Sequence, residues 1–82
     1  MIELREKVLL LGGAGTLGSD ILTSQLAKYE FFVIDNFADS TLSENEVRSL
    51  CQYEKANVAD LNALNDIFEK FNPQVVVYLA TT

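Results

Sequence analysis

A glycine-rich segment near the amino terminus carries the residues best suited to chemistry. Gly12, Gly15 and Gly18 recur every third residue, between an apolar run and an amphipathic stretch. The first glycine allows a sharp turn off a strand, the second lets the backbone approach a diphosphate, and the third permits close helix packing. The helix that begins within this segment would direct its unpaired N–H groups at the anion, and Thr16 and Leu17 are also candidate cofactor-binding residues. The spacing predicts a dinucleotide site; a strand-to-helix turn without a ligand is the alternative.

Asp35 is the second candidate binding residue. It follows the next apolar run, close to the spacing of about 20 residues at which dinucleotide folds place a carboxylate for the ribose hydroxyls. The sequence between Asp35 and Arg48 contains no Lys or Arg that could pair with a 2′-phosphate. We therefore expect NAD rather than NADP, which disfavours an NADP-dependent reductase. A turn residue that ends a strand is the alternative interpretation of Asp35.

Composition excludes several other classes of function. The 82 residues contain 6 Lys and Arg against 12 Asp and Glu, for a net charge of −6, with no histidine and one cysteine. This balance argues against nucleic-acid or anionic-membrane partners. A zinc cluster or a Ser-His-Asp triad cannot be assembled, so we expect no metal site. Cys51 is expected to be a small buried apolar residue, and its lack of an intrachain partner favours a cytoplasmic location.

The apolar pattern predicts the elements that must position these residues. Strands are expected at residues 8–11, 31–34, 53–58 and 75–79, and helices at residues 18–29, 44–50 and 61–71. Ser43 and Asp60 are suited to cap the second and third helices. Strands with unbroken apolar runs, separated by helices, indicate a parallel sheet covered on both faces. The prediction is one three-layer α/β unit over residues 1–82.

Four segments together resemble the extended short-chain dehydrogenase/reductase family, especially its nucleotide-sugar epimerases and dehydratases. They are Gly12–Gly18, similar to G-G-A-G-F-I-G; Asp35-Asn36-Phe37, similar to D-N-x; Asn57-Val58-Ala59-Asp60, similar to D-[IV]-x-D; and Tyr78-Leu79-Ala80-Thr81-Thr82, similar to H-L-A-A. The resemblance implies a Rossmann-like sheet of about four strands in the order 3-2-1-4, with NAD at the carboxyl ends of the strands.

The resemblance also assigns further binding residues. It implies that Asn36 joins Asp35 at the ribose and that Asn57 and Val58 hold the adenine. Leu79 and Ala80 would pass under the cofactor. The sequence departs from the family pattern at Thr16 and Leu17 in the glycine loop, at Asn57 in place of Asp, at Tyr78 in place of His, and at Thr81.

The catalytic part of such an enzyme is absent from this sequence. Family members use Tyr-x-x-x-Lys to move a hydroxyl proton, and Val33, Asn57 and Thr82 stand where the lysine would follow the three tyrosines. The chain therefore resembles the amino-terminal NAD-binding portion of a nucleotide-sugar epimerase or dehydratase, with no catalytic residue, and a nucleotide sugar is expected only in the intact relative. A stand-alone NAD-binding or regulatory module is the alternative. The apolar strand at residues 74–79 carries no Lys or Pro, so we expect self-association through its edge.

Overall fold

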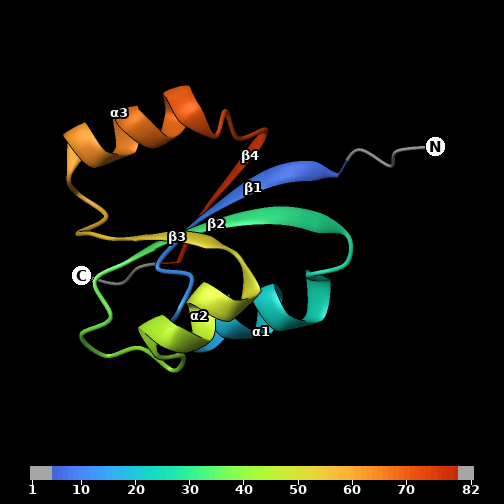
Figure 1. Ribbon diagram of the computed structural model, residues 1–82. Coiled ribbons are helices and arrows are strands. Elements are labelled where there is room, and N and C mark those ends of the chain that lie inside the picture. The colour runs from blue at the N-terminus through green and yellow to red at the C-terminus, as the bar shows by residue number, and fades with distance from the viewer. Residues whose placement is uncertain (1–4, 80–82) are drawn as a thin grey trace.

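The computed structural model describes residues 5–79, which form a parallel sheet between two layers of helices (Figure 1). The elements are β1 (Glu6–Leu11), α1 (Thr16–Gln25), β2 (Tyr29–Asp35), α2 (Glu44–Leu50), β3 (Gln52–Lys55), α3 (Leu61–Lys70) and β4 (Val75–Tyr78). The strands lie in the order β3-β2-β1-β4 and every pair is parallel. Helices α1 and α2 cover one face and α3 lies over the other. The predicted α/β class and strand order 3-2-1-4 are confirmed.

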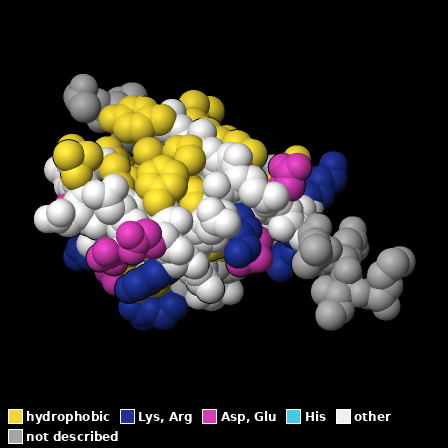
Figure 2. Space-filling model, turned by 90° about the horizontal axis from the view of Figure 1, so that it is seen from above, with side chains coloured by type: hydrophobic (Ala, Val, Ile, Leu, Met, Phe, Trp, Pro, Cys, Tyr) yellow, Lys and Arg dark blue, Asp and Glu magenta, His cyan; other side chains and the backbone are white. Residues whose placement is uncertain are grey.

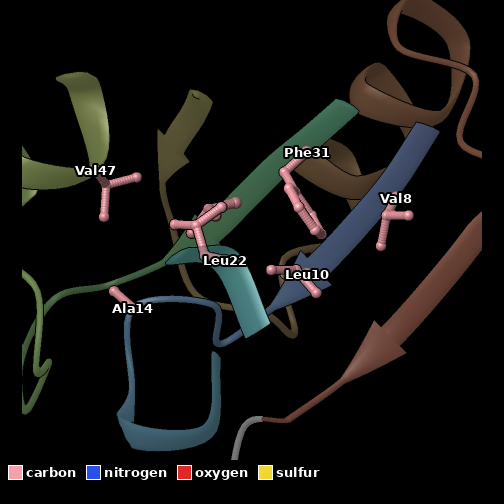
Figure 3. Close-up of a cluster of buried hydrophobic side chains, with 7 residues drawn as sticks. Val8, Leu10, Ala14, Leu22, Phe31 and Val47 are labelled. Carbon is pink, nitrogen blue, oxygen red and sulfur yellow. The ribbon is translucent and has the colours of Figure 1, made fainter. Parts of the chain in front are cut away.

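The two faces of the sheet bury alternate residues of the same strands. On the α1 and α2 side, Leu10 packs with Leu22 of α1 and Val47 of α2 (Figure 3). On the α3 side, Leu9 packs with Ile67 of α3. Successive side chains of a strand point to opposite faces. A strand covered on both sides must therefore be apolar at every position, which explains the unbroken runs in the sequence.

Local sequence determines where the second and third helices begin. The Ser43 hydroxyl accepts the Glu46 N–H, and the Glu46 carboxylate accepts the Ser43 N–H, which makes a complete capping box for α2. The Asp60 carboxylate accepts two N–H groups of the first turn of α3. Asn72 has a positive φ of 53° just after α3, a conformation that ends helices. Both predicted caps are confirmed.

Two of the predicted elements end several residues earlier than expected. The helix expected over residues 18–29 is α1, which ends at Gln25, and Tyr29 instead begins β2, where it pairs with Glu6 of β1. Tyr29 continues the helical spacing of the apolar residues before it, but its pairing with β1 in the sheet is the stronger influence. The strand expected over residues 53–58 ends at Lys55, because the Asn57 side chain accepts the Ala59 N–H and forms a turn.

Cys51 lies at the end of α2 and is half-buried rather than fully buried. Burial raises the pKa of its thiol to about 11. The thiol is therefore protonated at neutral pH and has little nucleophilic character.

Strand β4 forms an edge of the sheet and is poorly covered. In register with Leu9 and Leu11, Val76 and Tyr78 face the α3 side, where they are 44% and 56% exposed. Figure 2, seen from that side, shows hydrophobic side chains gathered on this surface. Helix α3 packs instead over Phe32, Ala56 and Val58, toward β2 and β3. The β4 end of this face therefore lacks a covering helix among residues 5–79.

Candidate functional site

The predicted binding residues gather where the strands end. The glycine loop follows β1, Asp35 ends β2, and the turn at Asn57 and Val58 follows β3. Hydrogen bonds join these segments: the Gly12 N–H donates to the Ile34 carbonyl at 2.8 Å, and the Ala56 N–H donates to the Asp35 carbonyl at 3.1 Å. In parallel sheets this carboxyl edge is where ligands bind.

Steric requirements explain three of the glycines. Gly12 has a φ of 84°, which favours glycine. A Cβ at Gly18 would lie 2.5 Å from the Gly13 carbonyl oxygen, and a Cβ at Gly13 would lie 2.8 Å from Leu10 Cβ. The predicted turn and close-packing roles of Gly12 and Gly18 therefore agree with the structure. The requirement at Gly13 was missed, because it depends on side chains of β1 and β2 that pack beneath the loop.

Gly15 differs from the other glycines because the fold does not require it. A Cβ there would meet only the Gly12 carbonyl oxygen, at an ordinary 3.5 Å, and its backbone is extended. It is the N-cap of α1 and supplies no side-chain hydrogen bond to the helix. Within residues 5–79 the N–H groups of Thr16, Leu17 and Gly18 have no hydrogen-bond acceptor. Thr16 and Leu17 are exposed, whereas Gly18 is buried. A helix start with unpaired N–H groups can accept an anionic group against its backbone.

Asp35 points its carboxylate at the glycine loop. Its Oδ2 accepts the Ala14 N–H at 3.1 Å and its Oδ1 accepts the Phe37 N–H at 2.8 Å. Phe37 has a φ of 59°, which is unusual for a bulky residue. Its N–H group in this conformation donates to the Asp35 carboxylate. A carboxylate has about four acceptor positions. The half-buried Asp35 therefore keeps acceptor capacity for two hydroxyl groups beside the helix start.

The remaining predicted residues have no hydrogen bond to the helix start or to the Asp35 side chain among the described residues. Asn36 is exposed and its Oδ1 accepts the Ala38 N–H, and Asn57 is also exposed and engaged in its own turn. Val58 is half-buried against the cluster on the α3 side. Leu79 lies beside the glycine loop, because its N–H donates to the Leu11 carbonyl at 2.8 Å. Ala80 lies outside the described residues. Cofactor contacts by these five residues stay predictions.

Two further features of the site were not found from the sequence. The Ala14 carbonyl accepts the N–H groups of Thr41 and Leu42, at 2.8 Å and 3.0 Å, so the loop before α2 is bound to the glycine loop. Lys55 is the strand neighbour of Asp35. The count of basic residues between Asp35 and Arg48 therefore gave an incomplete picture, because β3 places a lysine at the strand position paired with Asp35.

Residues 5–79 contain no group of three or more Cys, Asp or Glu side chains that could hold a metal ion. In the same residues, no helix has the length and apolar character needed to cross a bilayer.

Comparison with known proteins identifies relatives of this chain. The model of the NAD dependent epimerase/dehydratase family matches residues 8–82. The dTDP-glucose 4,6-dehydratase of Haemophilus influenzae is 34% identical over 79 residues, which cover 89% of this chain and 23% of that protein.

Solved structures of two enzymes also superimpose on this chain. The Bordetella bronchiseptica enzyme WbmG, in complex with NAD, superimposes with a TM-score of 0.84 at 30% identity, over 96% of this chain and 26% of that one. The UDP-glucose 4-epimerase of Brucella ovis, also in complex with NAD, has a TM-score of 0.82 at 26% identity, over 95% of this chain and 23% of its own. The chain thus spans about a quarter of the length of these relatives. Its sequence and fold place it in the NAD-dependent epimerase/dehydratase family.

Proposed function

We propose that this chain binds NAD through the adenosine diphosphate half of the cofactor. The diphosphate would lie against the N–H groups of Thr16, Leu17 and Gly18, and Asp35 would accept hydrogen bonds from the adenosine ribose. Asn36, Asn57, Val58, Leu79 and Ala80 complete the proposed site, on the resemblance to the family. NAD rather than NADP is the proposed cofactor, because Asp35 would repel a 2′-phosphate.

The observation that carries this proposal is the combination at the start of α1. The N–H groups of Thr16, Leu17 and Gly18 lack an acceptor in the described residues, and the space at the position of a Gly15 Cβ is open. The Asp35 carboxylate, which accepts the Ala14 N–H, lies beside them. A turn serving only to connect β1 to α1 would need Gly12, Gly13 and Gly18, but it would not need a glycine at position 15. The residues present therefore fit a dinucleotide.

We further propose that residues 1–82 form the amino-terminal portion of a longer nucleotide-sugar epimerase or dehydratase. Support comes from the family match and from the quarter of each relative that the chain covers. Bound NAD would supply a hydride acceptor and donor for the sugar. The residues of this chain would bind and orient the adenosine end, and the sugar nucleotide and the proton carrier belong to the remainder of such an enzyme. A cytoplasmic location is part of the proposal, supported by the single cysteine.

Calorimetric titration of the 82-residue chain with ADP-ribose and with NAD tests cofactor binding. ADP-ribose tests the adenosine half alone. We expect both to bind, and Gly15→Val to abolish binding while circular dichroism shows a retained fold, because a branched side chain would occupy the diphosphate position. Absence of binding by the parent chain, or undiminished binding by a folded Gly15→Val variant, would contradict the proposal. Binding of NAD without sugar-nucleotide turnover is expected for this chain alone.

A stand-alone NAD-binding or regulatory module is the second candidate. It shares the site but requires no catalytic remainder. The length of the parent open reading frame separates the two: continuation into a Tyr-x-x-x-Lys segment supports the enzyme, and a stop codon after Thr82 supports the module.

We also propose that the chain by itself associates through residues 74–79. The β4 edge and the exposed Val76 and Tyr78 support this, because an apolar edge strand is a template for pairing with another chain. Sedimentation at micromolar concentration should detect the association, and Val76→Lys should weaken it at least several-fold. Leu61→Lys is the matched control, since Leu61 is 72% exposed on α3 and lies away from the edge. A monomeric parent chain, or equal effects of the two variants, would contradict the proposal.

A further inference from the structure

A cluster of charged residues lies beside the proposed ribose site. Lys55 on β3 is paired in register with Asp35 on β2, one strand spacing of about 4.8 Å away. Val33 and Tyr53, two residues before each of them, both pack in the cluster on the α1 and α2 side. Because side chains alternate along a strand, Asp35 and Lys55 belong to that same face. A lysine therefore occupies the strand position beside the residue that would meet the ribose, on the same face of the sheet.

Glu44, the first residue of α2, forms an ion pair with Lys55. Its Oε1 lies 3.9 Å from Lys55 Nζ, and its Oε2 lies 3.5 Å from Arg48 Nη2. The same Oε2 accepts the Tyr53 hydroxyl at 2.7 Å. The Phe37 ring packs edge-on against Tyr53 at 5.8 Å, and the Phe37 N–H is bound by Asp35. Glu44 is thereby connected to the ribose side of the site through a short chain of contacts.

The two cations differ in how firmly they are held. Arg48 donates to Tyr53 Oη and to Asn45 Oδ1, each at 2.7 Å, and lies over the Tyr53 ring at 5.6 Å. Lys55 has only the Glu44 contact among the described residues, and its side chain is 60% exposed. Loss of the Glu44 charge would leave Arg48 in place but release Lys55. The flexible stem of a lysine would then let its ammonium group reach an anion beside Asp35.

We propose that Glu44 is a second determinant of the choice between NAD and NADP, acting as a positioning residue for Lys55. This inference rests on the proposed function. Asp35 repels a 2′-phosphate, and Glu44 keeps the neighbouring ammonium group paired so that it cannot compensate. Both carboxylates together make this end of the site unfavourable for a phosphorylated ribose.

Titration with ADP-ribose and 2′-phospho-ADP-ribose tests the inference. Glu44→Gln retains an acceptor for Tyr53 but removes the charge. We expect it to strengthen binding of 2′-phospho-ADP-ribose about fivefold, or about 1 kcal/mol, the upper range for an exposed charge pair. Binding of ADP-ribose should stay unchanged. The gain should be larger in an Asp35→Ala background, and Glu44→Gln/Lys55→Met should lose it.

Glu54→Gln is the matched control. It also removes one negative charge, but from an exposed residue of β3 that forms no ion pair within residues 5–79. An equal gain in Glu54→Gln would show a general charge effect and overturn the inference. So would unchanged binding of the 2′-phosphate ligand by Glu44→Gln, or a gain that survives Lys55→Met. If the parent chain binds ADP-ribose normally, these results overturn only the role of Glu44. Failure of the parent to bind ADP-ribose overturns the proposed function as well.

Discussion

Replacement of Gly18 by alanine tests whether close packing, rather than helix propensity, decides this position. Gly18 lies in the first turn of α1, where alanine would favour the helix by up to about 1 kcal/mol. The added Cβ would lie 2.5 Å from the Gly13 carbonyl oxygen and 2.6 Å from Gly13 Cα. These are backbone atoms, so the clash cannot be relieved by a side-chain rotation.

The glycine loop also cannot move away from α1, because β1 and β2 pack closely beneath it. The position of a Gly13 Cβ already lies 2.8 Å from Leu10 Cβ and 3.0 Å from a Val33 methyl group. Helix α1 must therefore move away from the sheet, at the overpacking cost of about 1–3 kcal/mol. This cost exceeds the gain in propensity. The net loss of about 1–2 kcal/mol should lower the midpoint of thermal unfolding by about 4–16 °C, given about 4–8 °C per kcal/mol for a domain of this size.

Thermal unfolding followed by far-ultraviolet circular dichroism measures the effect. Gly15→Ala is the control, because its Cβ would meet the Gly12 carbonyl oxygen at an ordinary 3.5 Å and its cost as an N-cap should stay below about 1 kcal/mol. We expect Gly15→Ala to unfold close to the parent chain. If Gly18→Ala unfolds at the same temperature as the parent or higher, propensity outweighs packing and the steric reasoning is wrong.

The remaining predictions concern three side chains. Asp35→Ala should lower the free energy of unfolding by about 1–3 kcal/mol, because the N–H groups of Ala14 and Phe37 lose their acceptor; an unchanged urea midpoint would contradict this. Because burial raises the pKa of Cys51 from 9.0 to about 11, its alkylation by iodoacetamide should be far slower in the native chain than in urea. Stability should also fall as pH rises from 9 toward 11, where the unfolded chain binds fewer protons; a flat profile would argue against burial. Asp60→Ala should cost about 1 kcal/mol and speed hydrogen exchange in the first turn of α3, whose N–H groups it caps; unchanged exchange would be inconsistent with the cap.

Features that depend on neighbours in the chain were predictable from the sequence alone. The unbroken apolar runs indicated buried parallel strands, and the caps at Ser43 and Asp60 indicated where two helices begin. Gly12 and Gly18 were assigned their steric roles from spacing, because the turn at Gly12 and the close contact of Gly18 with Gly13 involve residues near one another in the chain. The sequence also placed Asp35 at the end of β2, as the structure has it.

Only the tertiary structure decided which distant groups surround these residues. Tyr29 continues a helical pattern but belongs to β2, because pairing with β1 outweighs its spacing. The bond from the Ala14 N–H to Asp35, and the position of Lys55 beside Asp35, join segments far apart in the sequence. Strand register determines such pairs. Because register follows from how the sheet packs against its helices, the order of residues along the chain does not reveal it.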